Sequence, residues 1–164
     1  METIHHLLLD SAVGRYLFPL LLLVIANTAA WATGHVFGRD STAPLDFGIT
    51  LRDGTRLLGS HKTWRGLIGA AVACAIVTEH FQLGPLRGAA FGALSLLGDA
   101  GSSFVKRRLQ LSAGAEVPGL DQLPEALMPL LILQRPLGLG LIECLVIAVA
   151  FTVLDIAATR IRHL

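Results

Sequence analysis

The chain has 164 residues, of which 53% are hydrophobic and 15% are charged, and its formal net charge is +1. Soluble domains carry about 25% charged residues, so the composition excludes an ordinary soluble domain and indicates an integral membrane protein. The near-neutral charge provides no basic surface for binding nucleic acid. The length suits a single domain over residues 1–164. Cys74 and Cys144 lie in apolar segments without metal-type neighbours, so we interpret them as core residues.

Five apolar segments predict an all-α membrane protein with about five transmembrane helices. About 20 apolar residues are needed to cross the core of a bilayer, and the expected spans are 16–37, 66–83, 86–105, 123–134 and 137–158. The fourth segment is short and contains Pro129, so we expect a short or kinked helix there. Gly66, Gly69, Ala70 and Ala73 give the second segment a face of small residues suited to close helix packing.

Asn27 lies in the middle of the first apolar segment. An amide inside a bilayer needs a hydrogen-bonding partner, so this side chain should face other helices. Two interpretations are open. Asn27 either joins two helices or provides a polar contact to a ligand near the active face.

Two long polar connections, residues 38–65 and 106–121, interrupt the apolar segments. Five spans place both connections and the C-terminus on one side of the membrane. That side carries most of the Lys and Arg residues, so the positive-inside rule predicts that it is cytoplasmic. We therefore expect a multi-pass protein of the cytoplasmic (inner) membrane with two cytoplasmic loops. Asp53-Gly54 is a turn signal that predicts a hairpin-like excursion in the first loop.

The first loop ends in Lys62, Thr63 and Arg65, just where the second helix is expected to begin. Ser60 is a plausible N-cap for that helix. The free backbone N–H groups and the positive dipole end of a helix N-terminus favour anions, and these side chains add further donors. The pattern suits a phosphate or polyphosphate. The alternative is that these cations only anchor the end of a span.

The second loop lies between two acids, Asp99 and Asp121, and begins with Lys106 and Arg107. A lone carboxylate within a bilayer costs about 2.5–3.5 kcal/mol on insertion scales, so Asp99 needs either a partner or a role. It could pair with Lys106, two helical turns away. Alternatively, Asp99 and Asp121 together could hold a divalent cation such as Mg²⁺, which is typically bound by one or two carboxylates plus water and substrate phosphates.

Three stretches of the sequence resemble a known family. They are APLDFGITLRDGTRLLGSHKTWRGLIG (43–69), LLGDAGSSFVKRRL (96–109) and PGLDQL (118–123). Together, in this order, they are similar to the CDP-archaeol synthase family of membrane CTP-dependent cytidylyltransferases, which are related to phosphatidate cytidylyltransferase. The resemblance extends from the first span through Leu123. It implies five spans with the active-site loops in the cytoplasm.

The resemblance implies transfer of CMP from CTP to an archaeol-type lipid phosphate, which gives a CDP-lipid and pyrophosphate. Its implied partners are CTP, the lipid phosphate and the bilayer, and its implied cofactor is Mg²⁺. Asp99 and Asp121 resemble the metal ligands of the family and, with Lys106, the catalytic residues. Five residues resemble its phosphate-binding elements: Lys62, Thr63, Arg65, Lys106 and Arg107. Asp46 and Asp53 either order the first loop or contact the nucleotide.

Other interpretations are open. Residues 109–120 lack the Lys-Asp and His-Gly-Gly elements of phosphatidate cytidylyltransferase, which favours the archaeol branch, but a fatty-acyl lipid phosphate is an alternative acceptor. A small transporter could line its path with Asn27, Asp99 and Glu143. An inactive structural subunit is a third alternative, against which the intact acids and lysines argue. The sequence leaves both a monomer and a homodimer open.

Overall fold

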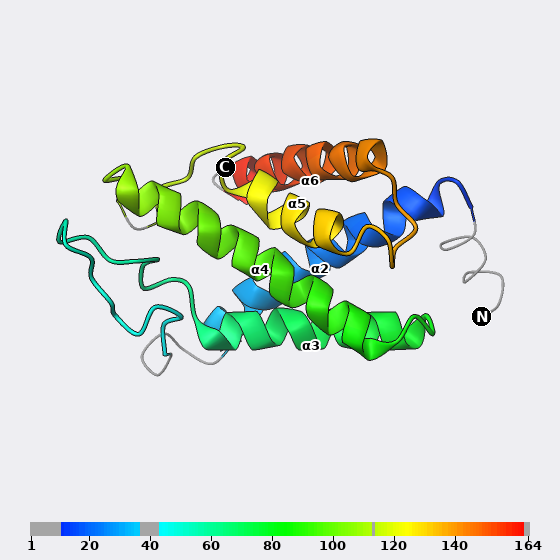
Figure 1. The fold of residues 1–164 in the computed structure, drawn as a ribbon, viewed down its shortest axis with the longest axis horizontal. Helices are drawn as coiled ribbons and strands as arrows, with labels where there is room; N and C mark the ends of the chain where they lie inside the picture. The colour runs from blue at the N-terminus through cyan, green and yellow to red at the C-terminus, as the bar shows by residue number, and fades with distance from the viewer. Residues whose placement is uncertain (1–10, 37–42, 113, 163–164) are drawn as a thin grey trace.

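A computed structural model of the chain describes residues 11–36, 43–112 and 114–162. These residues form five α-helices and no β-strand: α2 (Gly14–Val36), α3 (Trp64–His80), α4 (Pro85–Arg108), α5 (Gln122–Ile132) and α6 (Leu141–Arg162) (Figure 1). The all-α prediction is confirmed. The last helix begins at Leu141 instead of residue 137, because Gly138 adopts a φ of 66° and the chain turns there before α6 starts.

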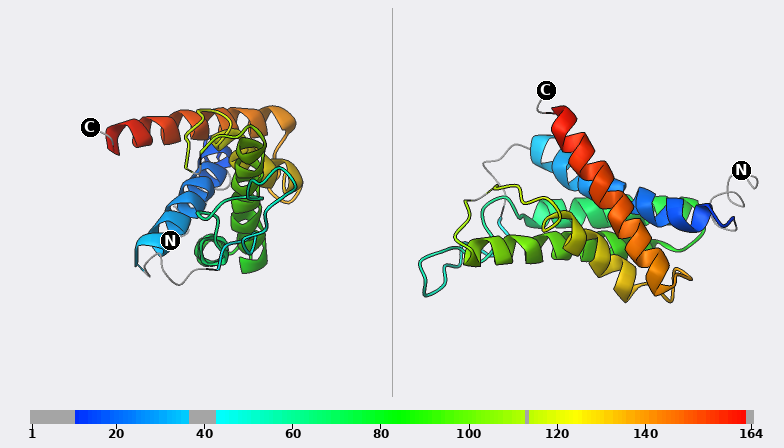
Figure 2. Two further views of the ribbon diagram at one scale, coloured as in Figure 1. Left: turned by 90° about the vertical axis from the view of Figure 1, so that its left-hand side faces the viewer. Right: turned by 90° about the horizontal axis from the view of Figure 1, so that it is seen from above.

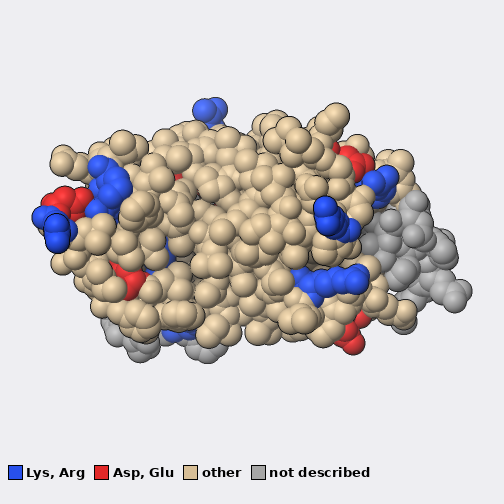
Figure 3. Space-filling view, in the orientation of Figure 1, with Lys and Arg blue, Asp and Glu red and all other residues tan. Residues whose placement is uncertain are grey.

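Two of the described helices, α2 and α6, are long and apolar enough to cross a membrane, and α5 is a shorter apolar helix of 11 residues. The outer face of α6 exposes a row of aliphatic side chains that includes Ile142, Val149 and Val153. On the face seen in Figure 3, most charged side chains lie toward the two ends and leave an uncharged middle. This distribution is typical of a protein surrounded by lipid.

Helix α4 lies at the centre of the bundle and contacts α2, α3 and α5. Two of its glycines make these contacts close. A Cβ atom on Gly92 would lie 2.4 Å from the backbone oxygen of Ala70 in α3, and one on Gly98 would lie 2.1 Å from the backbone oxygen of Pro124. Ala70 is fully buried, as expected for the small-residue face of the second segment. The backbones of α3 and α5 can therefore approach α4 only because these residues have no side chain.

The apolar core contains side chains from all five helices. Its largest members include Leu22, Phe91, Leu130 and Phe151. Cys74 and Cys144 are free, fully buried cysteines within it, which confirms their interpretation as core residues.

Both polar loops lie at the same end of the bundle, and α6 runs back toward that end (Figure 1). In the first loop, Pro44 pairs antiparallel with Thr63, and Thr50 pairs antiparallel with Arg56. The tip turns at Asp53 and Gly54, as the sequence predicts, and the amide of Leu51 donates to the carbonyl of Thr55 at 2.9 Å. The loop therefore folds back on itself and delivers Lys62 to the start of α3.

Candidate active site

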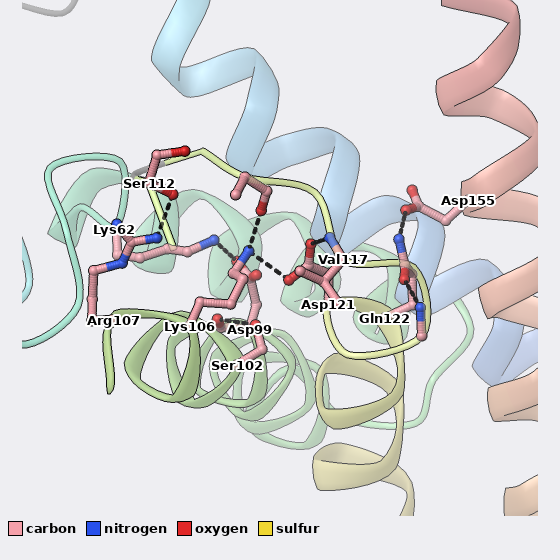
Figure 4. Close-up of polar contacts among 12 residues, drawn as sticks. Lys62, Asp99, Ser102, Lys106, Arg107, Ser112, Val117, Asp121, Gln122 and Asp155 are labelled. Atoms are coloured by element: carbon pink, nitrogen blue, oxygen red, sulfur yellow. Dashed lines mark hydrogen bonds and ion pairs between the residues drawn. The ribbon is translucent and has the colours of Figure 1, made fainter. Parts of the chain in front are cut away.

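Two lysine–aspartate ion pairs join the two loops to α4 (Figure 4). Lys62 of the first loop pairs with Asp99 in α4. The Nζ atom of Lys106 lies 2.6 Å from Oδ1 of Asp121 and also donates to the carbonyl of Ala115 at 2.9 Å. The alternative pairing of Asp99 with Lys106 is therefore wrong. These two residues lie two turns apart on one helix, whereas the first loop brings Lys62 directly to Asp99.

A cavity of about 190 Å³ surrounds the Lys62–Asp99 pair. Its lining comes from the first loop and from α2, α3, α4 and α5, and its polar members include Asn27, His61, Lys62, Thr63, Asp99 and Glu125. Three residues singled out by the sequence, Lys62, Thr63 and Asp99, thus line one cavity. Arg65, one residue inside α3, is not among its lining residues.

Helix α3 starts at the edge of this cavity. Its N-cap is Thr63, whose hydroxyl oxygen accepts a hydrogen bond from the amide of Gly66 at 3.2 Å. The prediction that Ser60 caps this helix is wrong, because the backbone pairing of Ala43 with Trp64 and of Leu45 with Lys62 keeps the chain extended up to Thr63. Lys62 is therefore the residue directly before the cap, beside the positive end of the helix.

Lys106 and Arg107 are both buried at the end of α4, but they point in different directions. Consecutive helical residues are 100° apart. Lys106 turns toward Asp121, whereas the guanidinium of Arg107 donates to the carbonyl of Ser112 at 2.6 Å. Arg107 lines a separate hollow of about 400 Å³ under the first loop, together with Arg56 and Ser60. The two cations therefore have different surroundings: Arg107 lines this hollow, whereas Lys106 is held by Asp121 and Ala115.

The two predicted metal ligands, Asp99 and Asp121, are each paired with a lysine. Oδ2 of Asp121 accepts from the amide of Val117 at 3.0 Å, while its buried Oδ1 accepts no hydrogen bond of normal geometry although the ammonium of Lys106 is close. The described residues contain no cluster of three or more His, Cys, Asp or Glu that could hold a metal ion. Two carboxylates fit Mg²⁺ when water and substrate phosphates complete its coordination.

Sequence reasoning missed Glu125, which lies on α5 and lines the cavity. Its exposed fraction is 7%, and the charges of Asp99, Asp121 and Lys62 act on it. A buried acid among other acids is costly unless cations or hydrogen bonds offset it. The sequence does hold a signal for Glu125, because it is a lone acid in an apolar segment and lies one helical turn after Asp121.

A hydrogen-bond network joins three helices beside the cavity. Asp155 of α6 accepts from the Asn27 amide at 3.0 Å through Oδ1 and from the Gln122 amide at 3.0 Å through Oδ2. Gln122 in turn accepts from the amide of Gly119 at 2.9 Å. The helix-joining interpretation of Asn27 is therefore confirmed. Because Asn27 also lines the cavity, contact with a ligand stays open.

Asp46 is the organising residue of the first loop, with an exposed fraction of only 2%. It accepts from Arg56 at 2.6 Å, from the amide of Gly48 at 3.0 Å, and from the amides of Leu58 and Gly59 at 3.1 Å each. Burial alone would raise the pKa of Asp46, but the bonds from Arg56 and the three amides together hold the pKa well below its usual range. The geometry favours loop ordering as its role.

Asp53 fastens the loop tip to α4. Its hydrogen bonds from the amide and hydroxyl of Thr55, at 3.0 and 2.9 Å, lower the pKa of its carboxyl, and the nearby Arg108 contributes to the same effect. The guanidinium of Arg108 lies 2.7 Å from Asp53 and also donates to Thr55 and to the carbonyl of Arg56. Sequence reasoning gave Arg108 no role, although it completes the Lys-Arg-Arg run.

The three residues proposed for a transport path do not come together at one place. Glu143 lies at the opposite end of the bundle, where it accepts from Arg15 at 3.3 Å and from the amide of Gly140 at 2.6 Å. Asn27 is bound to Asp155, and Asp99 is paired with Lys62. Asn27 and Asp99 line one cavity, but Glu143 is not among its lining residues. Among the described residues, the three therefore form no continuous polar path.

Comparison with known proteins assigns the chain to a family. A family model described as "CarS-like: CDP-archaeol synthase" matches residues 13–87 and 77–162. The CDP-archaeol synthase of Methanopyrus kandleri is 44% identical over 117 residues, which cover 68% of this chain and 64% of that protein. The CDP-archaeol synthase of Methanothermobacter thermautotrophicus is 37% identical over 142 residues, which cover 80% of each chain. The CDP-archaeol synthase of Aeropyrum pernix is 36% identical over 124 residues, which cover 71% of this chain and 69% of that protein.

The fold is also similar to that of a solved membrane protein. A structure described as "Structural insight into an intramembrane enzyme for archaeal membrane lipids biosynthesis" superposes with a TM-score of 0.67 at 32% sequence identity. The superposition covers 85% of this chain and 91% of that chain. With the apolar helices, this likeness identifies an integral membrane fold. The resemblance seen in the sequence is therefore confirmed, and the chain belongs to the CDP-archaeol synthase family.

Proposed function

We propose that this protein transfers CMP from CTP to an archaeol-type isoprenoid glycerol phosphate in the membrane, releasing pyrophosphate. Its membership of the CDP-archaeol synthase family supports this activity. The observation that carries the proposal is the arrangement of two lysines and two aspartates at one end of the bundle, where the loops meet the helix ends. Ammonium groups beside carboxylates are what a magnesium-bound triphosphate requires.

The reaction forms one phosphorus–oxygen bond and breaks another. An oxygen of the lipid phosphate attacks the α-phosphorus of CTP, and the bond from that phosphorus to the bridging oxygen of the β-phosphate breaks. Pyrophosphate leaves with the electron pair. Because such a transfer leaves little covalent work for the protein, positioning and charge stabilisation should account for most of the catalysis.

Lys62 and Lys106 are the cations best placed to bind the phosphates. Each of them pairs with a carboxylate, Lys62 with Asp99 and Lys106 with Asp121. Phosphate oxygens of the substrate would replace these carboxylates as the partners of the two lysines. Asp99 and Asp121 would then be free to hold Mg²⁺, which would supply positive charge to the triphosphate. Thr63 and Arg65 at the start of α3 form the second phosphate-binding element. Arg107 extends it toward the neighbouring hollow under the first loop.

The proposal includes a topology in which all five helices cross the cytoplasmic membrane and both loops face the cytoplasm. Single cysteines at Gly54 and Ser112, in a background lacking Cys74 and Cys144, should react with a membrane-impermeant maleimide only after cells are permeabilised. A cysteine at the connection between α3 and α4, at Gln82, is the control on the opposite side. Labelling of the Gly54→Cys or Ser112→Cys variant in intact cells would contradict a cytoplasmic location of the two loops.

The acceptor is tested by incubating purified protein with CTP, Mg²⁺ and a panel of lipid phosphates. We expect a CDP-lipid with the di-isoprenyl glycerol ether phosphate and little product with a fatty-acyl phosphatidate. The reverse preference would support the phosphatidate-type alternative, and no product with any lipid would contradict the proposal. Chemical crosslinking of the same preparation distinguishes a monomer from a homodimer.

A further inference from the structure

A third hollow, of about 610 Å³, lies between α2 and α6. The two helices spread apart toward their C-terminal ends, as the left view of Figure 2 shows. Each helix contributes one stripe of residues at helical spacing: Val24, Thr28 and Trp31 from α2, and Leu154, Ala158 and Ile161 from α6. We call this hollow the α2–α6 groove. Leu154 and Ile161 are well exposed, so the groove faces the surroundings of the bundle, which for a membrane protein is lipid.

The α2–α6 groove adjoins the polar cavity around Lys62. Asn27 and Trp31 line both. The groove is mainly apolar. Its polar members are Asn27, Thr28 and Asp155, and Asn27 donates to Asp155 at 3.0 Å. The second carboxylate oxygen of Asp155 accepts a hydrogen bond from the side-chain amide of Gln122, so both oxygens of this acid are hydrogen-bonded to side-chain amides. Polarity therefore increases from the groove, through Asn27, to the cations and acids of the cavity.

We infer that the α2–α6 groove holds one apolar chain of the lipid phosphate acceptor and that its phosphate enters the cavity past Asn27 and Trp31. This inference rests on the proposed function, because it assigns a place to that reaction's second substrate. An amphiphile is the ligand that matches an apolar groove opening into a cavity that contains an ammonium group. The stripe from Phe151 to Ile161 is about 15 Å long at the helical rise per residue, enough for the part of an isoprenoid chain nearest the head group.

Ala158 and Ala157 provide a matched pair of variants. Both are exposed on α6, but only Ala158 lines the groove. Ala158→Trp should raise the KM for a di-isoprenyl glycerol ether phosphate about tenfold, the size expected when a bulky side chain fills an apolar site, and leave the KM for CTP unchanged. Ala157→Trp should behave like the wild type. Equal lipid KM values for the two variants would overturn the inference.

Photo-crosslinking of the wild-type protein tests the groove without depending on how a variant folds. A di-isoprenyl glycerol ether phosphate with a diazirine on one chain should label the peptides that contain Val24, Leu154 and Ile161. Excess unlabelled lipid phosphate should suppress this labelling, whereas the same lipid without its phosphate should not. Equal suppression by both lipids, equal labelling of the exposed Ile68 and Val72 on α3, or crosslinks joining two copies of the chain would each overturn the inference.

The two proposals fail separately. If the wild type forms CDP-lipid but the groove is not labelled, the groove assignment is wrong and the proposed function stands. If labelling depends on the phosphate but no lipid yields product, the groove binds lipid phosphate and the proposed reaction is wrong.

Discussion

Lys62 and Asp99 form an ion pair although 37 positions separate them in the chain. Lys62 ends the first loop directly before the Thr63 cap of α3, and Asp99 lies within α4. This contact fixes the first loop over the helix ends and closes one side of the polar cavity. A second pair, Lys106 with Asp121, fixes the other loop in the same way.

The acids should be indispensable for turnover. Asp99→Asn and Asp121→Asn keep the size of each side chain but remove its charge, so both variants should lose at least about a hundredfold in kcat, as expected when charge stabilisation at a phosphate site is lost. CDP-lipid formation measures the loss, and circular dichroism checks that the helices remain. Glu79→Gln, an exposed acid at the far end of α3, is the matched control and should keep wild-type activity. A wild-type rate in either aspartate variant would show that the substituted aspartate is not needed for catalysis.

The two lysines should differ in their effect on stability. The side chain of Lys106 is 8% exposed, whereas that of Lys62 is 21% exposed. Removing one partner of a buried pair leaves the other charge uncompensated and costs about 3–5 kcal/mol. Lys106→Met should therefore lower the Tm in detergent more than Lys62→Met, while both should impair turnover.

A double variant separates stability from catalysis at this pair. Adding Asp121→Leu to Lys106→Met removes the unpaired charge, so the double variant should regain stability relative to Lys106→Met while its activity remains lost. Two results would show that burial of the Lys106–Asp121 pair does not govern stability: equal Tm values for Lys62→Met and Lys106→Met, or a double variant that is less stable than Lys106→Met.

The fold and part of the site could be predicted from the sequence. Apolar segments locate the helices, and Lys62, Thr63 and Asp99 do meet at one cavity. The partner of Asp99 could not be predicted, because it depends on where the first loop places Lys62 in space. Thr63 was not recognised as the N-cap because the backbone pairing of residues 43–45 with 62–64 is a long-range contact. Glu125 was overlooked because an apolar segment gives no indication of which face meets a polar cavity.

The glycines of α4 provide a test of the helix packing. A Cβ atom on Gly98 would lie 2.1 Å from the backbone oxygen of Pro124, whereas one on Gly101 would meet nothing within 4 Å. Gly98→Ala should force α5 away from α4 and cost about 1–3 kcal/mol of stability. Because α5 carries Glu125 and follows Asp121, activity should fall as well.

Gly101→Ala is the matched control on the same helix. It should be neutral or stabilise the protein by up to about 1 kcal/mol, since alanine has the higher helix propensity. Thermal unfolding in detergent measures both variants. A Gly98→Ala variant as stable as Gly101→Ala would show that α5 is not packed as closely as described.

Asp46 should make the first loop sensitive to acid. The pKa of this carboxyl is lower in the folded loop than in the unfolded chain, so its contribution to stability is present at neutral pH. That contribution is lost as the pH falls below about 4, the value of a free aspartate, toward the folded pKa. At neutral pH, Asp46→Asn should already speed hydrogen exchange at the amides of Gly48, Leu58 and Gly59, which lose their charged acceptor. Unchanged exchange at these three amides would contradict the loop-ordering role.

If the protein transfers CMP to a lipid phosphate, the position of an isotope label in the products shows which phosphorus of CTP is attacked. Purified protein is given CTP labelled at either the α- or the γ-phosphate, with Mg²⁺ and a di-isoprenyl glycerol ether phosphate. We expect the α-label to enter the lipid product and the γ-label to leave as pyrophosphate, both only when the lipid phosphate is present. Transfer of the γ-label to the lipid, or no labelled lipid from either CTP, would contradict it.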